Sequence, residues 1–149
     1  MTVDPFEQWS GDEMTQDEID ALLDSEGWGT LSMASGGEVY SLPISFGYTG
    51  EDIYFAFLRQ SPSDEKFEYI TDGQHVRLLV TDVTSRLDWQ SVAVSGPVTS
   101  IESGGDEWAN LLDSLEDNAW FSSDFRLAAM SHGLQGFRLT PQERQGRGF

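Results

Sequence analysis

Basic and hydroxyl side chains that could hold a phosphate gather between residues 59 and 66. Arg59, Ser63 and Lys66 lie there, and Lys66 is the only lysine of the chain. Ser61 and Pro62 are typical of the N-cap and the first position of a helix, where free backbone amides can bind an anion. The stretch therefore predicts a phosphate site at a helix N-terminus. The alternative is that Ser61 only caps the helix, while both cations pair with acids of the same segment.

A second candidate lies on a strand pattern between residues 88 and 98. Trp89, Ser91, Ala93 and Ser95 alternate along it, so they share one strand face that is mostly small and polar. Such a face could lie beside a planar ligand, and its hydroxyl groups could hydrogen-bond the rim of that ligand. The same pattern also fits a strand with one solvated face and with Trp89 packed at its end. The spacing alone does not separate the two interpretations.

The third candidate is the segment 40–48, whose alternation predicts a strand with one face of large side chains and one of small ones. The small face carries Ser41, Pro43 and Ser45, which would let a flat ring approach the backbone. Solvent exposure is the commoner alternative for such a face. Pro43 also lacks an amide hydrogen, so we expect this strand at an edge of the sheet or at a break in the ladder.

A small set of helices and strands must position these candidates. Thr15 and Glu18 form a capping-box pattern before a helix that Gly27 ends, and further helices are predicted near Ser61 and Asp106. Strands are predicted over 28–34, 40–48, 53–58, 75–83, 87–101 and 134–140, with a bulge or bend at 96–97. Antiparallel hairpins dominate, which predicts a mainly β, Greek-key barrel with peripheral helices. We expect a flexible arm over 1–13, one domain over 14–141 and a polar tail over 142–149.

The charge of the chain limits its partners. Asp and Glu number 26 against 8 Lys and Arg, a formal net charge of −18, so nucleic acid and anionic membranes would be repelled. The acids are spread along the chain, which favours adaptation to a salt-rich cytosol, as in a halophilic archaeon, over one acidic partner-binding face. The absence of cysteine excludes disulfides and thiolate metal sites, and no signal peptide or membrane span is expected. We therefore expect a cytoplasmic protein without a metal site.

The order of these pieces resembles the pyridoxamine 5′-phosphate oxidase-like superfamily of FMN-binding split barrels, and within it the small proteins of the nitroimidazole-resistance group. The resemblance covers about residues 15–101. It is carried by the leading helix, the segments 27–32, 40–48 and 53–55, the lysine that opens the next helix, and the segment 89–96. The fold that it implies is a split β-barrel.

The resemblance also implies a homodimer with FMN at the interface. Lys66, with Arg59 and Ser63, would hold the phosphate. The isoalloxazine would be lined by the backbone around Ile44, Ser45, Phe57 and Leu58. The ring or the ribityl chain would also be contacted by Trp89, Gln90 and Ser91, which the other subunit could contribute.

The function implied is an FMN-dependent oxidoreductase with an unknown small-molecule substrate, in which the flavin carries the electrons and no protein group is named as catalytic. The alternative is a non-catalytic module that binds or stores a flavin, a deazaflavin or haem. Ala56 and Phe57 replace the histidine segment that relatives of the nitroimidazole-resistance type often carry. The chain also offers fewer basic residues than the members that bind the phosphate with several of them, which keeps the deazaflavin and haem alternatives open.

Overall fold

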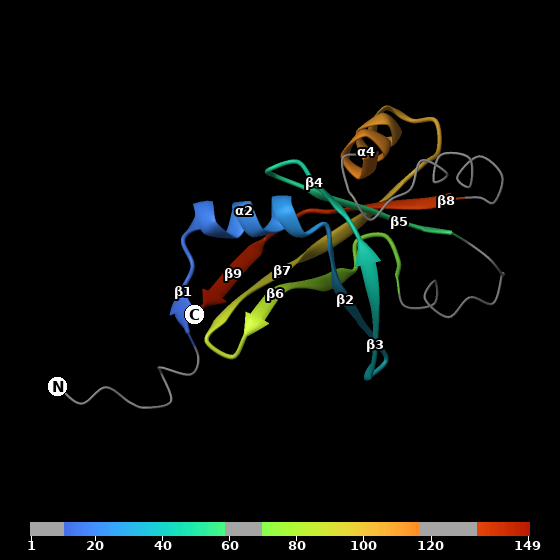
Figure 1. The fold of residues 1–149 in the computed structure, drawn as a ribbon. Helices are drawn as coiled ribbons and strands as arrows, with labels where there is room; N and C mark the ends of the chain where they lie inside the picture. Colours follow the sequence, from blue (N-terminus) through green and yellow to red (C-terminus); the bar gives the residue numbers. More distant parts are fainter. Residues whose placement is uncertain (1–10, 59–69, 117–133) are drawn as a thin grey trace.

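The structure is a computed structural model that describes residues 11–58, 70–116 and 134–149 (Figure 1). Two helices and nine strands form within these ranges. In chain order they are β1 (Asp12–Glu13), α2 (Gln16–Glu26), β2 (Trp28–Ser35), β3 (Glu38–Ser45), β4 (Gly47–Tyr48), β5 (Ile53–Leu58), β6 (His75–Ser85), β7 (Asp88–Ile101), α4 (Asp106–Glu116), β8 (Leu134–Leu139) and β9 (Glu143–Gly148).

All strand pairs are antiparallel, and the sheet runs in the order β3-β2-β6-β7-β8-β5-β4, with β9 pairing β7 and β1. Strand β3 ends this order, which confirms the edge position expected from Pro43. The path does not close between β3 and β4. The fold is therefore the split, mainly β barrel that the sequence predicted.

The 14-residue strand β7 joins the two halves of the barrel. Its first part pairs β9, from Gln90 to Ser95, and its last part pairs β8, from Val98 to Ile101. Gly96 lies at the change of partner, where a Cβ atom would overlap the carbonyl oxygen of Thr140. The bend predicted at 96–97 is therefore the corner at which β7 passes from one half-sheet to the other.

The core lies between the two halves, and α2 covers one side of it (Figure 1). The capping box forms as predicted, because Thr15 accepts from the amide of Glu18 at 3.2 Å and its own amide donates to the Glu18 carboxylate at 3.0 Å. Three side chains of α2 are buried in the core: Ile19, Leu22 and Leu23. Gly27 ends the helix with a φ of 71°.

Helix α4 packs on the opposite side of β5 and β8. Leu111 and Leu115 are buried there with Tyr54 and Ile101 in a second apolar cluster. Because neighbouring side chains of a strand point to opposite faces, Tyr54 contacts this cluster while Phe55 enters the main core. Within the described residues, neither helix is long and apolar enough to cross a bilayer.

Three sequence predictions differ from the structure. The prediction of a polar tail over 142–149 is wrong, because Glu143–Gly148 forms β9 and pairs with Gln90–Ser95 of β7. The flexible arm predicted over 1–13 is corrected at Asp12–Glu13, which forms β1 on β9. The single strand predicted over 40–48 divides at Phe46, whose amide donates to the carbonyl of Gly27 at 3.0 Å instead of to a neighbouring strand. The helix predicted near Ser61 lies outside the described residues.

Candidate functional site

One face of the sheet is left uncovered by the two helices, and we call it the outer sheet face. It is the side of β3, β2, β6, β7 and β9 that points away from the core. The pairing registers place the following residues on it: Val39, Ser41, Pro43 and Ser45 of β3; Trp28, Thr30, Ser32 and Ala34 of β2; His75, Arg77, Leu79, Thr81 and Val83 of β6; Trp89, Ser91, Ala93, Ser95 and Pro97 of β7; and Glu143, Gln145 and Arg147 of β9.

The outer sheet face is almost free of acids. Among the residues that the structure describes, Glu143 is the one carboxylate on these five strands, and Glu13, which pairs with Arg147 from β1, adds a second at the edge of the face. The whole chain carries 26 acids and a net charge of −18, so the acids are concentrated on the remaining surface. A protein gains nothing from keeping one solvated face free of its commonest charge, whereas a face that contacts a ligand or a partner loses stability if carboxylates are buried in it.

Large apolar side chains are exposed on the same face. Trp28, Val39, Leu79 and Val83 have 39%, 72%, 40% and 68% of their surface exposed. The described residues include six large apolar side chains that are exposed, and four of the six lie on the outer sheet face. A gathering of this kind is typical of an interaction site.

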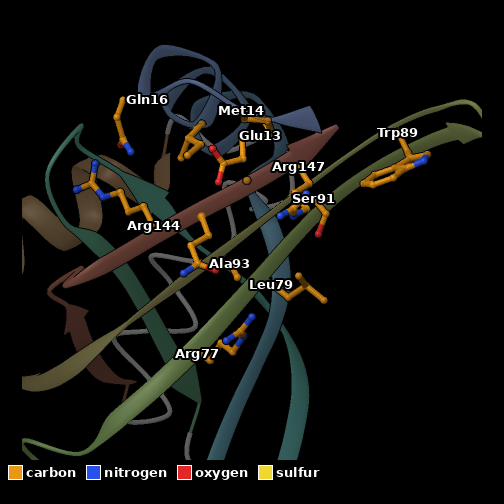
Figure 2. A pocket seen from close by; sticks show the side chains of 13 residues that line it. Glu13, Met14, Gln16, Arg77, Leu79, Trp89, Ser91, Ala93, Arg144 and Arg147 are labelled. Carbon is orange, nitrogen blue, oxygen red and sulfur yellow. The ribbon is translucent and has the colours of Figure 1, made fainter. Parts of the chain in front are cut away.

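A cavity of about 740 Å³ opens on this face along β6, β7 and β9 (Figure 2). Leu79 and Ala93, which pair across β6 and β7, form an apolar floor, and Ser91 adds a hydroxyl group beside them. Trp89 lies at one end, and Arg77 lies toward the other. This volume is in the range of small-molecule sites, which extends to about 1,000 Å³.

The cavity continues over β9 and meets a second one. Beyond β9 it is lined by Glu13 of β1, by Met14 and by Gln16 at the start of α2. The second cavity, of about 580 Å³, shares Trp89 and adds Gln90 and Phe149. The rings of Trp89 and Phe149 lie 6.5 Å apart. Trp89 is thus a wall of both cavities, and Gln90, on the opposite face of β7 from Ser91, faces the second one.

Three arginines line the larger cavity, and they differ in their partners. Arg144 is engaged, because it donates to the Tyr48 hydroxyl at 2.9 Å and to the carbonyl of Glu51 at 2.9 Å. Arg147 donates only to the carbonyl of Gly11, at 3.3 Å. Arg77 makes no hydrogen bond or ion pair with any residue in the described ranges. Arg77 therefore has the guanidinium most available to a ligand.

The structure brings together part of the predicted site. Trp89 and Ser91 line the larger cavity, and Gln90 lines the smaller one. Ser45 lies on the same outer sheet face, opposite Trp28 in the β2–β3 register. Continuing the β2–β6 register places Trp28 opposite Thr81, the partner of Ser91. Ser45 and Ser91 thus lie in one row across the sheet, with Trp28 between them.

The remaining predicted residues are placed elsewhere or are not described. Ile44 and Phe57 have buried side chains in the core, so only their backbone could contact a ligand. Leu58 ends β5 and pairs with Leu134. The predicted phosphate residues Arg59, Ser63 and Lys66 lie outside the described residues, and their role stays a prediction.

Sequence reasoning missed four residues of this site. Arg77 and Leu79 could have been found from the alternation of the strand predicted over 75–83, which places them together on the polar face. Trp28 could have been found in the same way at the start of β2. Arg147 could not, because the segment 143–148 has no apolar alternation that would indicate a strand.

Together these features define an open antiparallel barrel with a ligand-sized cavity on an acid-poor face. The apolar floor and the Trp89 ring can hold a flat ring, Ser91 can hydrogen-bond its rim, and Arg77 can neutralise an anionic group. These features suit the binding of a planar, anionic small molecule. The chain belongs to the pyridoxamine 5′-phosphate oxidase family, whose family model matches residues 15–148.

Solved structures share the fold at low sequence identity. A candidate pyridoxamine 5′-phosphate oxidase from Corynebacterium glutamicum is 20% identical, with 99% of this chain and 96% of that chain covered and a TM-score of 0.71. An FAD and haem binding protein from Mycobacterium smegmatis is 18% identical, with 90% and 71% covered and a TM-score of 0.68. A candidate 5-nitroimidazole antibiotic resistance protein from Bacteroides thetaiotaomicron is 15% identical, with 93% and 87% covered and a TM-score of 0.68. No curated protein sequence matches the chain.

Proposed function

We propose that this chain is an FMN-binding flavoprotein that acts as an oxidoreductase on a small molecule and works as a homodimer. The outer sheet face carries the proposal, because it combines a cavity of about 740 Å³ with exposed apolar side chains and a near absence of acids. Membership of the pyridoxamine 5′-phosphate oxidase family supports a flavin as the ligand. The substrate and the electron donor stay undefined.

The residues present fit a flavin. The isoalloxazine is planar, apolar on its faces and polar along its rim, which matches the Leu79–Ala93 floor, the Trp89 ring and the Ser91 hydroxyl. Bound flavin would supply the transfer of a hydride or of electrons. The contribution of the protein would be to bind and orient the ring and to exclude water from it. No described side chain is proposed as a general acid or base.

A second copy of the chain is the proposed cover for the outer sheet face. A symmetric dimer brings the same patch of each copy together, and a patch with exposed Trp28, Val39 and Leu79 is suited to such burial. The near absence of carboxylates removes the main obstacle to association between two chains of charge −18.

We also propose a salt-adapted, cytoplasmic protein. Among the described residues, acids are densest on α2, on α4 and in the turns, and they are sparse on the outer sheet face. Such a surface suits molar salt, where the Debye length falls to about 3 Å and repulsion between copies is screened. The lack of cysteine is compatible with a reducing compartment. Measuring stability between low and molar KCl tests this, and a protein that is fully stable at low salt would contradict it.

A flavin titration tests the main proposal. FMN added to apo-protein in molar KCl should lose fluorescence on binding and show a shifted visible spectrum. Lys66→Ala should weaken the binding by about 1–3 kcal/mol if the lysine meets the phosphate. Oxidation of a reduced nicotinamide or deazaflavin donor then tests turnover. An unchanged spectrum at high protein concentration would contradict flavin binding.

The second candidate is a non-catalytic module that binds or stores a flavin, a deazaflavin or haem. The similarity to an FAD and haem binding protein favours this candidate, and His75 on the outer sheet face offers an imidazole that could ligate haem iron. Haem added to apo-protein should then give a sharp Soret band that His75→Ala removes. Bound flavin with steady turnover would exclude storage as the function.

A further inference from the structure

We propose that Arg77 is the residue that recognises the phosphate group of the ligand on the outer sheet face. The inference rests on the proposed function, since it assumes that a phosphorylated flavin lies in the cavity between two copies. It assigns a specificity-determining residue on β6 from the described part of the chain alone.

The first step is that Arg77 lacks a partner where partners are abundant. Arg138 pairs with Glu107 and Arg144 pairs with Asp20, whereas Arg77 has no ion pair or hydrogen bond among the described residues. Arg147 also lacks a carboxylate partner in the described ranges, but it donates to the carbonyl of Gly11. With 26 acids to 8 basic residues in the chain, an arginine with neither kind of partner among the described residues requires explanation.

The second step concerns the surroundings of Arg77. Its cross-strand neighbours are Ser32 on β2 and Ser95 on β7, so small hydroxyl side chains flank the guanidinium and leave room for a group to approach it. Leu79 follows on the same face of β6. Arg77 therefore lies on the middle strand of the outer sheet face, at one end of the apolar floor.

The third step is that a covering copy cannot leave this charge unpaired. Burying an arginine without an anion carries a large free-energy penalty. In a symmetric dimer the covering copy presents the same face, on which the described residues offer two carboxylates, Glu143 on the flanking strand β9 and Glu13 on β1 beyond it. The ligand is therefore the better source of the anion.

A phosphate ester is the anion that fits a guanidinium best, because its oxygens can accept two parallel N–H groups. The cavity places that charge beyond the end of a floor suited to a planar ring (Figure 2). We infer that Arg77 favours FMN over riboflavin, which carries the same ring without the phosphate.

The experiment compares FMN and riboflavin on the full chain in molar KCl, with fluorescence quenching as the readout. Arg77→Gln should weaken FMN about tenfold to a hundredfold and leave riboflavin unchanged. Arg86→Gln is the matched control, because it removes the same charge from the β6–β7 turn, away from the cavity. It should change neither affinity.

The remaining outcomes separate the inference from the proposed function. Equal losses for FMN and riboflavin in Arg77→Gln, or no loss for either, would overturn the role of Arg77 while flavin binding stands. If Glu143→Gln and Arg77→Gln both weaken the ligand-free dimer, the anion is the carboxylate of the second copy and the inference is wrong. If the unmodified chain binds neither flavin, the proposed function fails and the inference fails with it.

Discussion

The guanidinium of Arg144 and the phenol of Tyr48 connect three elements that are far apart in sequence. Arg144, on β9, donates through Nη1 to the Tyr48 hydroxyl on β4 at 2.9 Å, and that hydroxyl donates to Asp20 Oδ1 on α2 at 2.6 Å. Arg144 Nη2 also donates to the carbonyl of Glu51 at 2.9 Å. This network fixes the middle of α2 and the β4–β5 turn against β9, beside the larger cavity.

Replacing the arginine by an uncharged residue of similar length should therefore destabilise the fold. Arg144→Met removes two hydrogen bonds of 2.9 Å and the 3.4 Å ion pair with Asp20 from a side chain that is 21% exposed, and we expect a loss of about 1–2 kcal/mol. Urea unfolding in molar KCl measures it. Glu51→Ala is the control, because its carbonyl and not its side chain accepts the bond, and it should change stability by less than about 0.5 kcal/mol. Equal effects of the two variants would contradict this role.

The same network makes stability fall at high pH. Burial, and next the hydrogen bond to Asp20, raise the pKa of Tyr48 from 10.0 to about 12. The folded state therefore keeps a proton that the unfolded state releases, so this stabilisation is complete below pH 10 and is lost as the pH rises toward about 12. Unfolding measured from pH 8 to pH 12 should show the unmodified chain losing its advantage over Tyr48→Phe. A constant difference across that range would contradict the shift.

Local chemistry explains why much of the fold could be predicted from the sequence. The Thr15 capping box and the αL Gly27 depend on neighbouring residues only, and both form as expected. The large and small faces of residues 40–45 depend on strand alternation, and Ile44 is buried while Pro43 is exposed. Features set by short-range geometry need no knowledge of the rest of the chain.

Features set by tertiary contacts could not be predicted. Strand β9 contains Gly146, which leaves room for Met14 and Ile19 where a side chain would collide with them. No alternation marks such a strand, because its pairing with β7 is made by the backbone. The availability of Arg77 was equally hidden, since its lack of a partner among residues 11–58, 70–116 and 134–149 becomes visible only when their carboxylates are placed. The candidate site was therefore half predicted, on β7, and half missed, on β6 and β9.

The corner of β7 should not tolerate a side chain at Gly96. A Cβ atom there would overlap the carbonyl oxygen of Thr140. The amide of Thr140 is itself held in place, because it donates to the carbonyl of Pro97 at 3.0 Å. We expect Gly96→Ser to destabilise the protein by about 1–3 kcal/mol. Gly105→Ser is the matched control, because a Cβ atom at Gly105 has 3.4 Å to its nearest neighbour and serine is a good N-cap before α4. Thermal unfolding compares them, and a tolerated Gly96→Ser would mean that the corner can open.

A carboxylate placed on the outer sheet face should separate the proposed dimer. Ala93 is half-buried on β7 between Leu79 and Gln145, so Ala93→Glu would bury a charge whose arginine neighbours on this face are Arg77, on β6, and Arg147, on β9. We expect the dimer dissociation constant to rise about a hundredfold, as measured by sedimentation in molar KCl. Ala109→Glu adds the same charge on the exposed side of α4 and should leave the dimer intact. Because the two variants share one net charge, dissociation of both would indicate general repulsion, and dissociation of neither would mean that another surface joins the copies.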